Sequence, residues 1–252
     1  MANWSDPRPD AGVTPMGRAG VDTRSTTFDA GLRAYMLSVY NYMASAVLLT
    51  GIVAASVAYS GAWQALVSAN GRGLSPLGWI VSLVPLGIVF AMSFGQQRMS
   101  AGTLQALFWA YAGLLGASLS IIFIAYTESS IAGAFFATAA GFAGLSLYGY
   151  TTERNLSALG TFMIIGLVGI IVASLVNLFL HSGPLGLVIS VLGVLIFAGL
   201  TAWHTQQTKA VYSYVAGTPD EGRAKIMAAL RLYLDFINMF LFILRLFGSS
   251  RN

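Results

Sequence analysis

The stretch AALRLYLDFINMFLFILRLFG, residues 228–248, decides the fold class of this 252-residue chain. It is long enough to cross a bilayer as a single helix, which takes about 20 residues. It nevertheless carries a carboxylate, Asp235, about two turns from its start, whereas the other Asp and Glu residues lie in the polar N-terminus or between apolar runs. A charged group at membrane depth is costly, so Asp235 is a candidate functional residue.

The composition of the whole chain agrees with a membrane protein, since 56% of its residues are hydrophobic and only 9% are charged. The apolar runs lack the alternating pattern of barrel strands, and backbone groups in lipid must be satisfied internally, so we expect helices. We predict an all-α membrane protein: a seven-transmembrane helix bundle over residues 30–248. A polar, flexible cytoplasmic tail is expected at 1–29, with Asp29 as the N-cap of the first helix. The expected spans are 34–59, 77–95, 103–126, 131–150, 159–180, 184–204 and 227–247.

Several functional classes receive no support from the sequence. The chain has no cysteine, which excludes disulfides, thiolate metal sites and cysteine nucleophiles. Its thirteen Lys and Arg residues are scattered singly, so the net charge of +4 does not indicate a nucleic-acid partner. The HExxH, GxSxG, Walker and GxGxxG motifs are absent. We therefore expect no enzyme activity, no cofactor and no metal site beyond a weak interaction with Ca²⁺.

The distribution of positive charge predicts the orientation. Nine Lys and Arg residues fall on the side of the N-terminus and two on the other side. Because cytoplasmic loops carry the excess of Lys and Arg, we expect a multi-pass inner-membrane protein with its N-terminus in the cytoplasm and its C-terminus outside.

The last predicted helix carries a polar face. Arg231, Asp235, Asn238, Phe242 and Arg245 follow one another at steps of 4, 3, 4 and 3 residues, which places them on one side of a helix. Such a face is unfavourable against lipid, so we expect it to point into the bundle or a polar cavity.

A second polar residue, His204, closes the sixth apolar run and is expected at a depth similar to that of Asp235. Imidazole and carboxylate each favour the charged form of the other, so this pair would titrate jointly and respond to pH. A different arrangement is an inert structural ion pair between Asp235 and Arg231, one turn apart on the same helix.

Two further patterns predict helix packing. Gly133, Ala137 and Gly141 recur at four-residue spacing on the fourth span, which is typical of close contact between membrane helices. Polar side chains within other spans are expected to form interhelical hydrogen bonds. These are Asn41, Gln105 and Asn177.

The segment LRLYLDFINMFLFILRLFG, residues 230–248, resembles the C-terminal signature of the transmembrane Bax inhibitor motif family, also called the Bax inhibitor-1 family. The seven-span layout and the sixth-span ending AGLTAWHTQQTK, residues 198–209, extend the resemblance over roughly residues 30–248. The resemblance implies a seven-helix bundle around the last helix. It also implies that bacterial members act as pH-sensitive calcium leaks, that eukaryotic ones affect organelle calcium and cell death, and that some bacterial relatives associate with a membrane protease.

The leak mechanism that the resemblance implies uses two aspartates, on the sixth and seventh helices, which share a proton and hold a pore closed. Asp235 matches the second aspartate. The first normally stands between Tyr and Thr, and here that stretch reads Trp203-His204-Thr205, so a histidine replaces the acid. An Asp–His pair is strongest with a charged His and an ionised Asp, and the missing acid removes an oxygen ligand for calcium.

The same mechanism adds an arginine near the end of the second helix as part of the latch. That place is taken here by Gln96 or Gln97, with Arg98 just beyond. Arg231 stands where the family more often has a small or neutral residue.

Two functions therefore compete. The first is a pH-sensitive ion (calcium) leak, with Asp235 as the gate acid, His204 as its partner and Arg231 as a local counter-charge. The second is a non-transporting regulatory protein that binds a membrane protease or another membrane complex. The oligomeric state is left open by the sequence.

Overall fold

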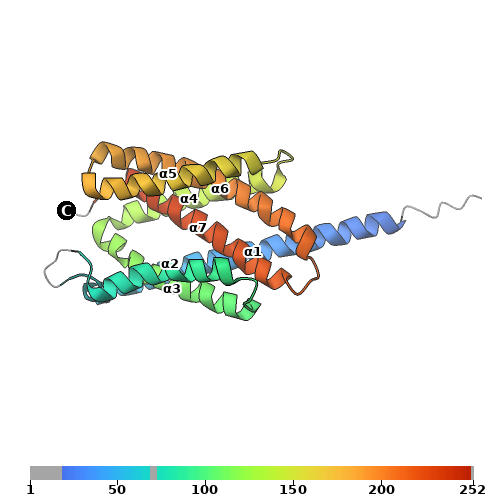
Figure 1. The fold of residues 1–252 in the computed structure, drawn as a ribbon, viewed down its shortest axis with the longest axis horizontal. Helices are drawn as coiled ribbons and strands as arrows, with labels where there is room; N and C mark the ends of the chain where they lie inside the picture. The colour runs from blue at the N-terminus through green and yellow to red at the C-terminus, as the bar shows by residue number, and fades with distance from the viewer. Residues whose placement is uncertain (1–18, 69–72, 251–252) are drawn as a thin grey trace, which may run out of the picture.

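The computed structural model describes residues 19–68 and 73–250, with side chains from Phe28 onward. In this part of the chain, seven α-helices and one short 3-10 helix form a bundle that contains no β-strand (Figure 1). The helices are α1 (Ala19–Tyr59), η1 (Ala62–Leu66), α2 (Pro76–Gly95), α3 (Ala101–Ala125), α4 (Glu128–Thr151), α5 (Ser157–Leu180), α6 (Gly183–Val215) and α7 (Glu221–Phe247). All seven α-helices are long and apolar enough to cross a membrane. The predicted all-α membrane bundle is confirmed.

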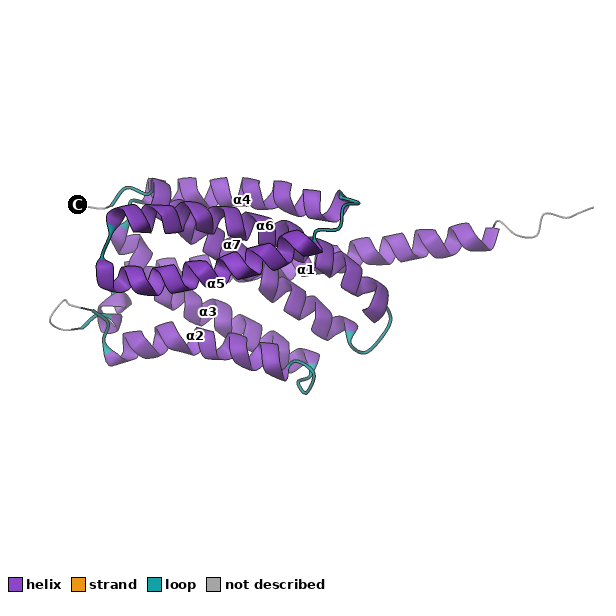
Figure 2. Ribbon diagram, turned by 45° about the horizontal axis from the view of Figure 1, so that its top comes forward, coloured by secondary structure: helices purple, strands orange, loops and turns teal. Residues whose placement is uncertain are grey.

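The last helix is the centre of this bundle, as predicted. α7 packs against α1, α3, α4 and α6, and lies between them in both ribbon views (Figures 1 and 2). In the most apolar 18-residue stretch of α7, 61% of the residues are buried, whereas in that of α5 only 6% are buried. α7 therefore has a protein environment along most of its length, while α5 faces outward.

Helix starts follow the turn and cap signals in the sequence. Ser75 and Ser182 each accept a hydrogen bond from a backbone N–H in the first turn, of α2 and α6 respectively. A proline stands in the first turn of both helices, where a missing N–H costs nothing. Asn70, Gly71 and Arg72, which stand between the first two predicted spans, lie outside the described residues.

Three helices extend beyond the apolar runs that predicted them. α1 is already helical from Ala19, so the N-cap prediction for Asp29 is wrong, and the tail predicted for 1–29 is helical over its last eleven residues. α6 continues eleven residues past His204, to Val215, and α7 begins six residues earlier than expected, at Glu221. Hydropathy reports where lipid contact ends, and a helix can continue into water with polar residues on its surface.

The small-residue stripe of α4, Gly133, Ala137 and Gly141, does not mediate packing against the described residues. A Cβ atom added at Gly133 or Gly141 would meet no atom within 4 Å, so that prediction is wrong for the monomer. Close contact occurs instead at Gly149, where an added Cβ would run into the backbone carbonyl of Ala202 on α6. Likewise, Gly116 of α3 abuts the backbone carbonyl of Thr50 on α1.

The polar side chains expected to join helices do not do so. Asn41 is exposed, and neither its side chain nor that of Gln105 forms a hydrogen bond within the described residues. Asn177 accepts a bond from the backbone N–H of Ser182 at 3.0 Å, which caps the tight α5–α6 turn locally. Hydroxyl groups carry out the interhelical bonding instead, as described below.

Candidate functional site

The two polar residues of the predicted pair are in direct contact. Nδ1 of His204 on α6 lies 2.6 Å from Oδ2 of Asp235 on α7, in hydrogen-bond and ion-pair geometry. The carboxylate side chain is 3% exposed and the imidazole 17% exposed. The ring of His204 also packs against that of Trp203, with centroids 4.9 Å apart. Asp235 thus joins α7 to α6 and does not stand as an isolated buried charge.

The pair lies farther from the ends of its two helices than the sequence indicated. His204 is eleven residues before the end of α6 and Asp235 fourteen residues after the start of α7. At 1.5 Å per residue, these separations are about 16 and 21 Å from the α6–α7 connection. The pair is therefore well inside both helices, not at the end of either.

A groove between α5, α6 and α7 contains the pair. It has a volume of about 560 Å³ and mostly apolar walls from α5, such as Ile170 and Leu175. Arg231, Asp235, Asn238 and Phe242 all line it, which confirms that they share one face of α7. Arg245 lies in a different cavity, with His181 and Asn177 at the α5–α6 turn, so the polar face is divided between two sites.

Arg231 does not pair with Asp235, although both line the groove. The ion pairs found among residues 28–68 and 73–250 are His204–Asp235, Arg223–Asp220 and Lys225–Glu221. Arg231 is exposed. The inert Arg231–Asp235 ion pair considered above is therefore not formed.

Asn238 contributes to the wall of the groove without a bond to the pair. Its amide donates to the backbone carbonyl of Leu234 on its own helix at 2.8 Å. Its amide oxygen is the polar group one turn beyond the carboxylate, on the same face of α7.

The residues expected to support the latch lie elsewhere. Gln96 and Gln97 line a separate pocket just after the end of α2, together with Asp220, the N-cap of α7, and Arg223 in the first turn of α7. Arg223 donates to the backbone carbonyl of Gln97 at 2.9 Å. Arg98 is exposed and has no ion pair within the described residues. These residues join α2 to α7 at the end of the bundle and do not contact His204 or Asp235.

The sequence reading missed two hydroxyl networks. Tyr40 of α1 bonds Ser146 of α4 at 2.6 Å, and Ser146 bonds Thr205 of α6 at 2.9 Å. Thr50 of α1 donates to the carbonyl of Ala112 on α3, and Tyr233 of α7 is bonded to Thr50 at 2.6 Å. The only sequence signal was a hydroxyl inside an apolar run, which is too common to be diagnostic.

Comparison with known proteins decides the family. The family described as "Inhibitor of apoptosis-promoting Bax1" matches residues 32–252, nearly all of the bundle. This chain belongs to the Bax inhibitor-1 family. An uncharacterized protein of Rickettsia prowazekii is 47% identical over 91% of this chain and 95% of its own length. The inner membrane protein YbhL of Escherichia coli is 43% identical over 88% of this chain and 94% of its own length.

Membership extends to distant bacteria. An uncharacterized membrane protein of Streptococcus pyogenes is 37% identical over 89% of this chain and 96% of its own length. This Bax inhibitor-1 protein is thus a multi-pass membrane protein that spans almost the full length of these relatives. Its candidate site is centred on the Asp–His contact between α6 and α7.

Proposed function

We propose that this Bax inhibitor-1 protein is a pH-sensitive cation leak of the inner membrane, in which the His204–Asp235 bond holds α6 against α7. The 2.6 Å contact between a buried carboxylate and an imidazole carries the proposal. The inner-membrane location is supported by the printed name of the Escherichia coli relative.

The pH response follows from the proton count of the pair. With one proton shared between them, the pair has no net charge. It is then either a carboxylate bonded to an imidazolium or a carboxylic acid bonded to a neutral imidazole. A second proton leaves a net positive charge, and loss of the proton leaves a net negative charge in a poorly hydrated place. Either change weakens the contact, so the α6–α7 latch is strongest at intermediate pH.

Cations would reach the pair through the groove. Oδ1 of Asp235 has no hydrogen bond within the described residues and would bind water or a passing cation. Together with the amide oxygen of Asn238 it offers few ligands, whereas calcium takes six to eight oxygens. The described residues hold no cluster of three His, Asp or Glu side chains suited to a metal ion. Calcium is therefore proposed as a transient cargo that keeps most of its water, and Arg231 limits its entry by charge repulsion.

Calcium flux into proteoliposomes, measured across a pH series, tests the proposal. Asp235→Asn keeps the shape and removes the titrating acid, so the leak should lose its pH dependence. His204→Ala leaves the buried carboxylate without its partner and should raise the leak at intermediate pH, because the α6–α7 contact is lost. Glu153→Gln, an exposed change in the α4–α5 connection, is the matched control and should behave as wild type. Unchanged flux and pH profile in both pair variants would contradict the proposal.

A second function, regulation of another membrane protein, has one specific observation in its favour. The face of α4 with Gly133, Ala137 and Gly141 is exposed and has the spacing of a helix-docking surface, yet no helix in the described part of the chain covers it. The flux assay separates the two functions. A protein without flux that co-purifies with a stoichiometric membrane partner, such as a protease, would support the regulatory role.

A further inference from the structure

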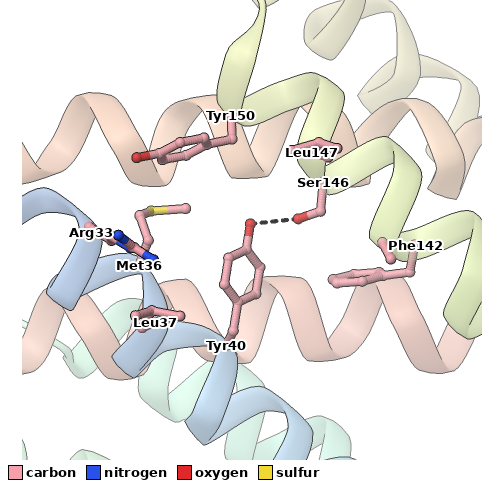
Figure 3. Close-up of a pocket in the computed structure, with 9 residues that line it drawn as sticks. Arg33, Met36, Leu37, Tyr40, Phe142, Ser146, Leu147 and Tyr150 are labelled. Carbon is pink, nitrogen blue, oxygen red and sulfur yellow. Dashed lines mark hydrogen bonds between the residues drawn. The ribbon is translucent and has the colours of Figure 1, made fainter.

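A second groove, distinct from that of the Asp–His pair, opens between α1 and α4 (Figure 3). Its volume is about 500 Å³, within the range of sites for small molecules. Met36 and Leu37 from α1 and Phe142 and Leu147 from α4 make its body apolar. The groove lies on the outside of the bundle, where lipid is the surrounding solvent.

One end of this groove is basic. Arg33 lines it and is exposed, and Figure 3 shows its guanidinium at the same end as the hydroxyl of Tyr150. Within the described residues Arg33 has no ion pair, not even with Asp29 one turn earlier. Lys209 adds positive charge next to this end, since its Nζ lies 3.0 Å from the carbonyl of Tyr150 and 5.2 Å from the centroid of its ring.

The body of the groove offers no unsatisfied hydrogen-bonding group of its own. Tyr40 and Ser146 are its polar residues away from the basic end, and they are bonded to each other at 2.6 Å, with Ser146 also bonded to Thr205. The hydroxyl of Tyr150, at the basic end, has no hydrogen bond within the described residues. An occupant that fits is therefore apolar along most of its length and anionic at one end.

The position along the helices agrees with such an occupant. Arg33 lies five residues into the apolar span of α1, and Tyr150 one residue before the end of α4. The basic end is thus near the membrane surface, on the side where the positive-inside rule puts the cytoplasm, and the apolar body extends toward the bilayer centre. Headgroups and acyl chains of phospholipids have this same arrangement.

We propose that the α1–α4 groove is a binding site for an anionic phospholipid of the cytoplasmic leaflet. One acyl chain occupies the apolar body, and the phosphate binds the guanidinium of Arg33 and the hydroxyl of Tyr150. Arginine suits this role because its planar group donates two parallel hydrogen bonds to phosphate oxygens. Basic pockets between membrane helices on the cytoplasmic side are known to bind anionic headgroups.

Native mass spectrometry of the purified full chain tests this proposal, with phosphatidylglycerol and phosphatidylcholine of identical chains as probes. Wild type should retain phosphatidylglycerol in preference to phosphatidylcholine, by about fivefold for one charge contact. Arg33→Gln should remove the preference. Its matched control, Arg154→Gln, changes an exposed arginine of the α4–α5 connection that is outside the groove and should keep the preference.

Two bulky substitutions test the acyl-chain part. Ala143→Phe fills the groove and should abolish retention of both lipids, whereas Ala140→Phe, exposed on the same helix but outside the groove, should leave retention unchanged. Equal retention of the two lipids by wild type, or an unchanged preference in Arg33→Gln, would overturn the proposal. So would displacement of phosphatidylglycerol by inorganic phosphate, since that result would mean that the anion alone is recognised.

Discussion

His204 and Asp235 are the titratable residues that join α6 to α7 at the candidate site, and the proposed pH response depends on how many protons the two share. The shared-proton state of an Asp–His pair is neutral overall. The shared-proton state of a pair of aspartates, by contrast, carries one negative charge, and the pair is neutral only when both are protonated. A histidine at position 204 therefore makes acid, as well as alkali, a condition that weakens the contact.

His204→Asp should convert a two-sided pH response into a one-sided one. Wild type is expected to leak least at intermediate pH and more on both sides of it. In the variant, acid neutralises both carboxyls and preserves their hydrogen bond, so only the rise in flux at alkaline pH should remain. Calcium flux into proteoliposomes over the pH series measures this change.

The other histidine provides the control for that measurement. His181 is exposed in the α5–α6 turn with φ of 49°, a conformation that Asn also tolerates. His181→Asn should keep the wild-type profile. If flux still rises at acidic pH in His204→Asp, the pair does not cause that rise.

Helix length and helix contact are the features that matter at the scale of elements. α6 and α7 continue past the apolar runs toward their connection, and this brings Arg223 of α7 into contact with Gln97 in the α2–α3 connection. Contacts between helices depend on a few glycines that allow backbones to meet. Gly149 of α4 is such a position because the carbonyl of Ala202 on α6 lies where its Cβ would be.

Gly149→Ala should separate α4 from α6 and destabilise the protein by about 1–3 kcal/mol, the usual cost of overpacking. Gly141→Ala, on the same helix, adds a methyl group in open space and should be neutral or stabilising by up to about 1 kcal/mol, because alanine favours helix. Reversible unfolding in detergent micelles measures both. Equal losses of stability in the two variants would show that the α4–α6 contact does not cause the destabilisation of Gly149→Ala.

At the scale of the whole molecule, the start of α1 and the C-terminus lie at opposite ends of the bundle (Figure 1). The α2–α3, α4–α5 and α6–α7 connections lie at the same end as the start of α1, as seven crossings require. The two lateral grooves share no helix. The groove with the Asp–His pair lies between α5, α6 and α7, and the groove with Arg33 lies between α1 and α4. Which end faces the cytoplasm stays a prediction from the distribution of Lys and Arg.

Single cysteines test the orientation cleanly, because the chain has no cysteine of its own. Glu153→Cys and Tyr214→Cys lie at the end of the bundle expected in the cytoplasm, and Gln64→Cys lies at the other end; all three positions are exposed. A membrane-impermeant maleimide should label only Gln64→Cys in intact spheroplasts and the other two in inverted vesicles. The opposite labelling would reverse the orientation.

Much of this architecture follows from sequence because hydropathy is local. The apolar runs predicted the seven helices, the polar face at 231–245 predicted a side of the last helix turned away from lipid, and the family resemblance implied that this helix is central. Helix ends were less predictable, as at Ala19 and Val215, because a helix continues into water without a hydropathy signal. The stripe at Gly133 was misread since small residues indicate possible contact but not the presence of a partner.

The sequence by itself determined the fold class, the family resemblance and the identity of the costly acid, Asp235. Only the tertiary structure decided which group pairs with that carboxylate. Arg231 is one turn away on the same helix, yet His204, 31 residues earlier, takes the contact at 2.6 Å. The physical reason is that partner choice depends on the angle and separation of α6 and α7, which are set by packing over the whole bundle and are not encoded by local spacing.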